Sequence, residues 1–137
     1  MRQEKSCGAV VFRRTGKGRE YLIEHMAMGH YAHCKGHVEG KETERETAIR
    51  EIREETNIEI SFVDGFRECT AYSPSLNAWK ECVYFLAEAI SKDEIVQLEE
   101  VSDVLWLSYE KAREVLTYEN DRELLDKAES FLNYEGV

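Results

Sequence analysis

The sequence has 137 residues, a mass of 16.0 kDa and a strongly acidic balance. Its 28 Asp and Glu residues against 18 Lys and Arg residues give a formal net charge of −10, so the surface as a whole repels nucleic acid and anionic lipid. A hydrophobic fraction of 42% and a single proline are typical of a globular protein rather than a disordered or fibrous one. We therefore expect one folded domain over residues 1–137 that binds neither nucleic acid nor membranes.

The cysteines indicate the compartment. Cys7, Cys34, Cys69 and Cys82 are widely spaced and form no C-x-x-C pair. No apolar N-terminal stretch resembles a signal peptide or a membrane span. We expect free thiols and a reducing, cytoplasmic location.

Hydrophobic spacing predicts strands mixed with helices along the whole chain. Residues 6–12 and 21–23 are apolar runs on either side of a basic, glycine-bearing turn, which indicates a hairpin. Residues 73–79, which hold the only proline, are the most loop-like stretch outside the N-terminal third. The other expected elements are strands at 58–66, 81–89 and 101–107 and helices at 43–57, 109–116 and 120–134.

The first predicted helix carries a cluster of carboxylates. Its start is marked by Thr43 and Glu46 at capping-box spacing. At about 100° per residue, Glu51, Glu54 and Glu55 fall within one arc of the helix, with apolar residues turned away. Like charges at such spacing destabilise an isolated helix by a few tenths of a kcal/mol per pair, roughly, so a bound divalent cation such as Mg²⁺ is one explanation for the cluster. The alternative is a solvated acidic face paired with nearby arginines.

The order of residues from Gly36 to Ile58 decides between these two explanations. It resembles the Nudix box, G-x(5)-E-x(7)-R-E-U-x-E-E-x-G-U, in which U is aliphatic. Eight of the nine specified positions match, and only Asn57 stands where the family has Gly. Asn tolerates the left-handed backbone conformation that ends a helix, so Asn57 is expected to replace that Gly at a modest cost in strain.

The resemblance to Nudix hydrolases implies a fold, a chemistry and a ligand set. The fold is α/β, a three-layer α/β/α sandwich with a mixed sheet, as a single domain with its box at residues 36–58. The activity is metal-dependent hydrolysis of a phosphoanhydride bond in a nucleoside polyphosphate, with Mg²⁺ or Mn²⁺ as cofactor. The implied catalytic and metal-binding residues are Glu51, Glu54 and Glu55 as ligands, Arg50 as their orienting partner, the Lys35 carbonyl, and a later carboxylate, Glu100 in preference to Glu99.

A narrower resemblance concerns the substrate. The stretches 7–14 and 35–39 look like the asymmetrical diadenosine tetraphosphate hydrolases, which implies a small nucleotide as the partner, cleaved to ATP and AMP. By the same resemblance the implied substrate-binding residues are Lys80 for phosphate, Tyr84 for the adenine ring, Tyr72 and Tyr118 for the rest of the pocket, and His37 in the stretch before the box. Tyr31, Cys34 and Gly40-Lys41 depart from what that branch commonly has, which are Trp, Pro and Pro-Gly.

Several alternatives stay open on sequence alone. The chain is also compatible with a pyrophosphatase of nucleoside triphosphates or of nucleotide sugars such as ADP-ribose, and with a non-catalytic nucleotide-sensing module. The pocket tyrosines are equally compatible with half-buried structural aromatics, and Lys80 with a surface charge. A zinc site is a weaker alternative, built from His30, His33, Cys34 and His37, because no usual paired spacing accompanies these residues.

Overall fold

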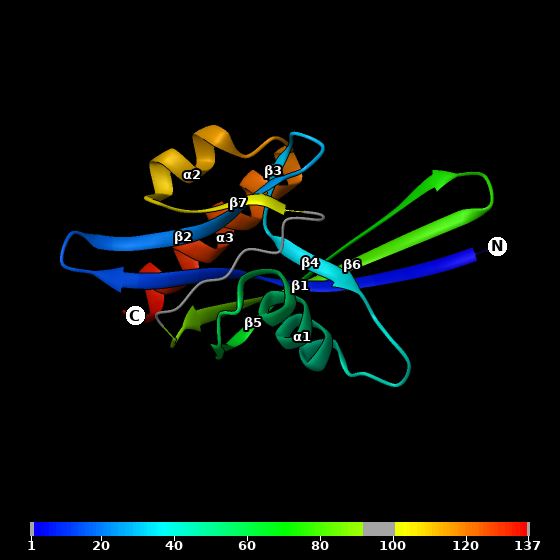
Figure 1. Cartoon of the computed structure of the whole chain (residues 1–137), viewed down its shortest axis with the longest axis horizontal. Helices are drawn as coiled ribbons and strands as arrows, with labels where there is room; N and C mark the ends of the chain where they lie inside the picture. Colours follow the sequence, from blue (N-terminus) through cyan, green and yellow to red (C-terminus); the bar gives the residue numbers. More distant parts are fainter. Residues whose placement is uncertain (1, 92–100, 137) are drawn as a thin grey trace.

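The computed structural model describes residues 2–91 and 101–136. Within these ranges seven strands form one mixed sheet (Figure 1). The elements in chain order are β1 (Arg2–Thr15), β2 (Gly18–Met26), β3 (Tyr31–Ala32), β4 (Cys34–His37), α1 (Glu44–Thr56), β5 (Ile60–Ser75), β6 (Ala78–Ala89), β7 (Val101–Leu107), α2 (Tyr109–Val115) and α3 (Glu119–Glu135).

Strand β1 organises the sheet. It runs parallel to β6 from Arg2 opposite Ala78 to Phe12 opposite Glu88, and antiparallel to both β2 and β4. The order of the main path is β3-β2-β1-β6-β5, with β4 paired to β1 and β7 paired to β2. Gly8 permits the contact with β4, because a Cβ there would lie 1.9 Å from the Cys34 carbonyl oxygen.

Two hydrophobic cores lie on opposite faces of this sheet, as the alternation of side chains along β1 requires. Cys7, Ala9 and Val11 pack with Ala48 and Ile52 of α1. The alternate residues of β1, together with residues of α2 and α3, form the other core: Val10, Phe12, Ala112, Leu124, Leu125, Ala128 and Leu132. The molecule is therefore a three-layer α/β/α sandwich, with α1 on one face and α2 and α3 on the other (Figure 1).

The predicted elements agree with these bounds at most places. The hairpin of β1 and β2, the helix α1 and the strand β7 lie where the spacing predicts them. The loop predicted at 73–79 is confirmed only as a turn at Leu76 and Asn77, because β5 continues to Ser75 and β6 begins at Ala78. Proline is tolerated in β5 because this is an edge strand and its pairing with β6 is irregular between Tyr72 and Ser75.

All four cysteines are free thiols, as expected. Among the residues described, no helix is both long and apolar enough to cross a membrane.

Candidate active site

Helix α1 begins and ends as its sequence predicts. The Thr43 side chain accepts a hydrogen bond from the Glu46 backbone, and the Glu46 side chain accepts one from the Thr43 backbone, which completes the capping box. Asn57 ends the helix in the left-handed conformation at φ 60°, where the family pattern has Gly. The carboxylates near the C-terminal end of α1 are therefore held on a helix with defined ends.

Glu51 lies directly against strand β4. A Cβ added to Gly36 would lie 1.9 Å from the Glu51 carboxyl carbon and 2.2 Å from both of its oxygens. Any larger residue at position 36 would displace this carboxylate. The Gly of the sequence pattern is thus explained by the close approach of a carboxylate to the backbone.

Arg50 connects the carboxylates to the loop before the helix. Its Nη1 donates to Glu51 at 2.9 Å and to Glu54 at 3.2 Å, so oxygens of both residues meet at one nitrogen. Its Nε donates to Glu42 at 2.6 Å and its Nη2 donates to the His37 carbonyl at 2.8 Å. Arg50 therefore orients carboxylates on α1 and fixes residues 37–42 beside them.

Glu42 is the loop residue that Arg50 binds most directly. Hydrogen bonds from the Arg50 guanidinium and from the Glu39 backbone lower the pKa of Glu42 to about 2. Its Oε1 also accepts from the Thr47 hydroxyl at 2.9 Å. Glu42 is thus ionised at neutral pH and acts as a counter-ion of Arg50 rather than as an acid.

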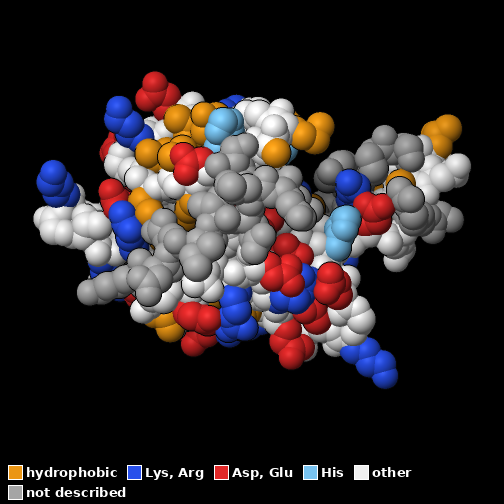
Figure 2. All heavy atoms as spheres, viewed as in Figure 1, with side chains coloured by type: hydrophobic (Ala, Val, Ile, Leu, Met, Phe, Trp, Pro, Cys, Tyr) orange, Lys and Arg blue, Asp and Glu red, His pale blue; other side chains and the backbone are white. Residues whose placement is uncertain are grey.

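The three carboxylates of the arc differ in depth. The Glu54 side chain is 58% exposed, whereas that of Glu51 is 14% exposed and Glu55 is buried. The arc is therefore not one solvated acidic face, since helix spacing fixes the angle of a side chain but not what packs over it. Figure 2 shows acidic and basic side chains gathered together over the part of the surface formed by α1.

Glu55 points inward, to residues that the sequence pattern does not connect with it. The Cys34 thiol donates to Glu55 at 2.6 Å, and the Glu24 carboxyl lies beside both. Burial, and then the nearby Glu55, raise the pKa of Glu24 well above its usual range. Burial is also the main cause of the raised pKa of Cys34. Glu24 was missed by the sequence analysis, and an acidic residue in the otherwise apolar run of β2 was the signal that it offered.

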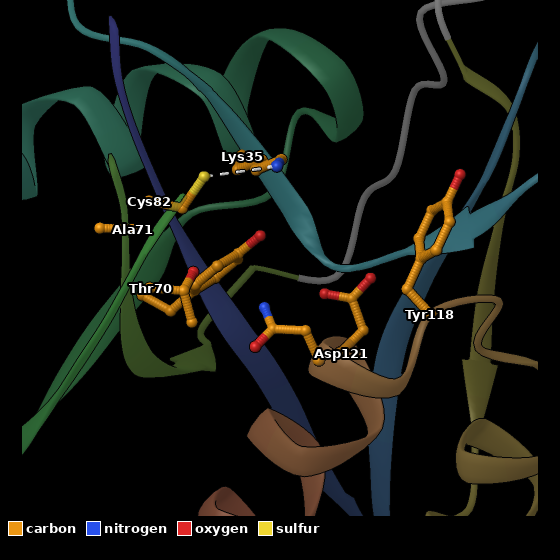
Figure 3. A pocket seen from close by; sticks show the side chains of 8 residues that line it. Lys35, Thr70, Ala71, Cys82, Tyr118 and Asp121 are labelled. Atoms are coloured by element: carbon orange, nitrogen blue, oxygen red, sulfur yellow. Dashed lines mark hydrogen bonds between the residues drawn. The ribbon is translucent and has the colours of Figure 1, made fainter. Parts of the chain in front are cut away.

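A cavity of about 720 Å³ lies on the other side of β4 (Figure 3). The Lys35 ammonium enters it and donates to the Cys82 thiol at 3.5 Å. Among the described residues, the cavity is lined by Lys35, Thr70, Ala71, Cys82, Tyr84, Tyr118, Asn120 and Asp121. Its volume is in the range of small-molecule sites.

Tyr84 and Tyr118, two of the predicted pocket tyrosines, have different environments. Tyr118 is 55% exposed, so one side of its ring is open to the cavity and solvent, and its ring centre lies 5.7 Å from that of His30. Tyr84 is only 2% exposed and its ring meets the buried His33 edge-on. Tyr84 thus forms part of the cavity wall, whereas Tyr118 offers a free ring face.

Other cavity residues were not predicted. Asp121 is buried at the N-terminal end of α3, and burial raises its pKa. Its carbonyl oxygen lies 3.0 Å from His33 Nε2. Thr70 and Asn120 also reach the cavity. These residues lie far from the box in sequence, and no motif indicated them.

The remaining predicted residues are placed as follows. Lys80 lies on β6, two and four residues before Cys82 and Tyr84, and therefore on their face of the strand, with its Nζ 3.6 Å from Glu4. The Tyr72 backbone is paired with Lys80 across β5 and β6. The His37 side chain is exposed. Glu99 and Glu100 lie outside the described residues.

The alternative zinc site is not assembled. Among the described residues, Cys34 groups with Glu24 and Glu55 and not with the three histidines. His33 is buried against Asp121, and the His30 ring lies tilted against that of Tyr118.

Strand β4 joins the two halves of the site. Cys34 and Gly36 face α1, where they meet Glu55 and Glu51, while Lys35 between them faces the cavity. This arrangement follows from the alternation of side chains along a strand. Adjacent residues of β4 thus contact the α1 carboxylates on one face of the sheet and the cavity on the other.

Comparison with known proteins identifies the family of this chain. The NUDIX domain model matches residues 3–128. The chain belongs to the Nudix family. It is therefore a Nudix hydrolase with the Nudix fold.

Within the Nudix family, the chain is similar to proteins of known name. The chain is 31% identical to the mouse asymmetrical bis(5'-nucleosyl)-tetraphosphatase, over 93% of this chain and 95% of the relative. It superposes on the Caenorhabditis elegans Ap4A hydrolase in a binary complex with a TM-score of 0.84 and 28% identity, covering 95% and 98% of the two chains. The NUDIX domain of Shewanella oneidensis NrtR, complexed with ADP ribose, matches at a TM-score of 0.77 but 18% identity, with 96% and 90% coverage, and shares the fold.

The Nudix box residues fit the divalent cation that the family implies. Glu51, Glu54 and Glu55 supply carboxylate oxygens, the donor type that hard divalent cations prefer. The Gly36 backbone forms a cradle for the Glu51 carboxylate that a Cβ would fill. The arrangement is suited to holding a cation between the α1 carboxylates and the backbone of β4.

Proposed function

We propose that this chain hydrolyses a dinucleoside tetraphosphate, represented by diadenosine tetraphosphate, to ATP and AMP. The observation that carries the proposal is the position of β4, which presents Gly36 to a carboxylate of α1 and Lys35 to a nucleotide-sized cavity. The proposal is supported by the similar relatives, which are named for this activity. A long polyphosphate is the kind of substrate that extends from a base pocket to a neighbouring cluster of cation-binding carboxylates.

On the α1 side, Glu51, Glu54 and Glu55 hold Mg²⁺ in this proposal. When bound, Mg²⁺ would neutralise phosphate charge and make the attacking water more acidic. Glu54 is the base that takes the proton of the attacking water, because its side chain is the exposed one of the three. Arg50 keeps Glu51 and Glu54 together through its Nη1. Glu100 stays a predicted further ligand.

On the cavity side, lysines and tyrosines bind the nucleotide. The Lys35 ammonium lies in the cavity. Lys80 lies on β6, on the face of that strand that carries Cys82 and Tyr84. Both complement phosphate as point charges. Tyr118 stacks on an adenine ring because its face is open, while Tyr84 shapes the wall of the pocket. Tyr72 and His37 stay predicted substrate-binding residues.

The test is Mg²⁺-dependent hydrolysis of diadenosine tetraphosphate, ATP, 8-oxo-dGTP and ADP-ribose in parallel, with products separated by chromatography. The proposal predicts that diadenosine tetraphosphate has the highest kcat/KM and yields ATP and AMP in equal amounts. Preferential cleavage of a triphosphate or of ADP-ribose would assign the chain to a pyrophosphatase activity instead. Absence of cleavage of every compound would favour the nucleotide-sensing alternative.

A further inference from the structure

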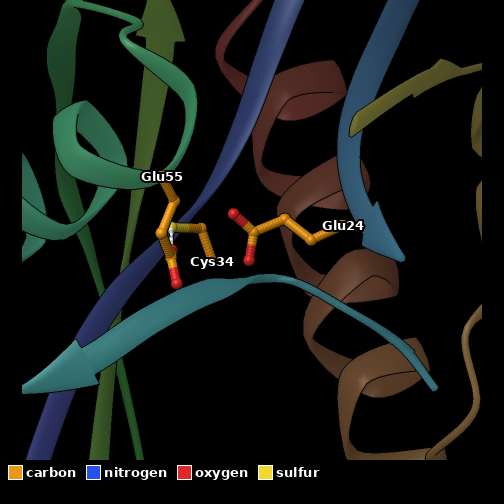
Figure 4. A group of neighbouring side chains, drawn as sticks. All are labelled: Glu24, Cys34 and Glu55. Carbon is orange, nitrogen blue, oxygen red and sulfur yellow. Dashed lines mark hydrogen bonds between the residues drawn. The ribbon is translucent and has the colours of Figure 1, made fainter. Parts of the chain in front are cut away.

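A group of side chains lies on the α1 side of β4, deeper than Glu51 and Glu54. Glu24 of β2, Cys34 of β4 and Glu55 of α1 direct their ligand atoms to one point, and these atoms all lie within 4.8 Å of one another (Figure 4). Of the described part of the chain, this is the one group of three His, Cys, Asp or Glu residues that meets so closely. Three separate elements have to fold together to form it.

The group is buried, and one of its oxygens has no hydrogen-bond partner in the part of the chain that the structure describes. Glu24 and Cys34 are each 1% exposed, and Glu55 is 5% exposed. Glu24 Oε2 makes no hydrogen bond within residues 2–91 and 101–136, although a buried carboxylate oxygen without a partner is costly. Figure 4 shows the Glu24 carboxyl pointing toward Cys34 and Glu55. The Glu24 carboxyl therefore faces a thiol and a second carboxyl, a set that a cation would complete.

We propose that Glu24, Cys34 and Glu55 form a binding site for a thiophilic divalent transition metal of the zinc class. Zn²⁺ is commonly held by thiolate and carboxylate ligands in tetrahedral geometry, and three protein ligands leave one position open. A thiolate ligand selects zinc-class metals over Mg²⁺, which prefers octahedral oxygen coordination. The site therefore differs in metal preference from the carboxylates that face solvent on α1.

The charge and proton balance of this site is simple. The metal bonds to Cys34 Sγ, and the thiol proton leaves to solvent. Glu24 and Glu55 each contribute an oxygen lone pair, and a proton bound to either carboxyl also leaves. The divalent charge offsets two of the three negative charges that would otherwise be buried together. No oxidant or reductant is required.

Cys34 is the residue that gives this chain its zinc preference. The diadenosine tetraphosphate hydrolases that this chain resembles commonly have proline at the position of Cys34. Proline has no metal-ligand atom, so the resemblance does not imply this metal site. Glu55 belongs both to this group and to the Nudix box. A metal bound here takes Glu55 Oε2, the oxygen that meets the Cys34 thiol, and leaves Glu55 Oε1 for the Mg²⁺ of the proposed function.

The test uses metal binding and does not depend on hydrolysis. Metal-stripped, reduced protein is titrated with Co²⁺, and absorbance is followed for a thiolate-to-cobalt charge-transfer band. We expect the band to saturate at one Co²⁺ per chain, to disappear when Zn²⁺ is added, and to persist in excess Mg²⁺. Cys34→Ala should lack the band. The matched control is Cys7→Ala, which removes another buried thiol on the same face of the sheet and should keep the band.

A second variant tests the site without altering its thiol. Glu24→Gln preserves side-chain shape but removes an anionic ligand, and we expect its Zn²⁺ affinity, measured by competition with a chromophoric chelator, to fall at least about tenfold. Circular dichroism verifies that each variant is folded. If Cys34→Ala does not fold, the Zn²⁺ affinity of Glu24→Gln tests the proposed site in its place. Absence of the band in wild-type protein, its retention in Cys34→Ala, or unchanged Zn²⁺ affinity in Glu24→Gln would overturn the proposal. None of these results would affect the proposed hydrolysis.

Discussion

The α1 side of strand β4 and its cavity side are built from different parts of the sequence. On the α1 side, Arg50 gathers Glu42, Glu51 and Glu54 from one contiguous stretch. On the cavity side, Lys35, Tyr84 and Tyr118 come from parts of the chain that are distant in sequence. The reaction chemistry therefore depends on a local motif, whereas substrate choice depends on how the whole sheet and α3 assemble.

The largest effect is expected on the α1 side, at Glu54. Glu54→Gln should lower kcat by about 10²- to 10⁴-fold, the contribution typical of a positioned general base, because its exposed carboxylate takes the proton of the attacking water. The variant should remain folded, since this side chain is 58% exposed. Glu123→Gln on α3 is the control and should retain normal kcat. An unchanged kcat in Glu54→Gln would remove Glu54 from the reaction.

A smaller effect on activity is expected when the carboxylates keep their charge but lose their hydrogen bonds to the Arg50 guanidinium. Arg50→Lys keeps the positive charge but cannot reproduce the guanidinium fork that reaches Glu42, Glu51 and the His37 carbonyl together. We expect kcat/KM to fall about 10- to 100-fold and the Mg²⁺ concentration for half-maximal rate to rise. Arg53→Lys, on the same helix but paired with Glu59, should change neither value. Equal behaviour of both variants would contradict the role given to Arg50.

On the cavity side the expected effect is on binding rather than on kcat. Tyr118→Ala should raise KM for diadenosine tetraphosphate by about 5- to 150-fold, which corresponds to the loss of about 1–3 kcal/mol of base stacking. KM for inorganic polyphosphate should change less, because that substrate has no base. Tyr134→Ala is a control that removes another exposed tyrosine. If Tyr118→Ala raised KM equally for both substrates, Tyr118 would not contact the base.

The smallest effect concerns the end of α1. Asn57→Ala should lower the free energy of unfolding by about 1–2 kcal/mol, because an alanine is strained at the left-handed φ of 60°. Asn57→Gly should change it by less than about 1 kcal/mol, because glycine adopts this conformation without strain but loses more entropy on folding. Urea unfolding measures both. Asn77→Ala, at an exposed turn residue without positive φ, is the control, and equal losses in all three variants would contradict this explanation.

The α1 side was largely predictable because its signals are local. The capping box at Thr43, the arc of glutamates and the left-handed Asn57 all follow from spacing within one helix. Depth was not predictable, since helix spacing does not show that β4 covers Glu55 while Glu54 stays open. Glu24 was missed for the same reason, because only the tertiary fold brings the Glu24 side chain of β2 close to Glu55 of α1.

The cavity side was predictable only through family resemblance. Lys80, Tyr84 and Tyr118 were inferred in that way, but nothing local distinguishes the buried ring of Tyr84 from the exposed ring of Tyr118. Asp121 gave no signal, because its place at the cavity depends on how α3 packs on the sheet. The strand β4 itself is too short for hydrophobic alternation to reveal it.

The most direct test of the central claim is the return of Mg²⁺ to metal-stripped protein in the presence of diadenosine tetraphosphate, with products resolved at each concentration. We expect no cleavage before Mg²⁺ is added, and then equal amounts of ATP and AMP that rise with the Mg²⁺ concentration. Cleavage without any divalent cation, or release of two molecules of ADP, would contradict it.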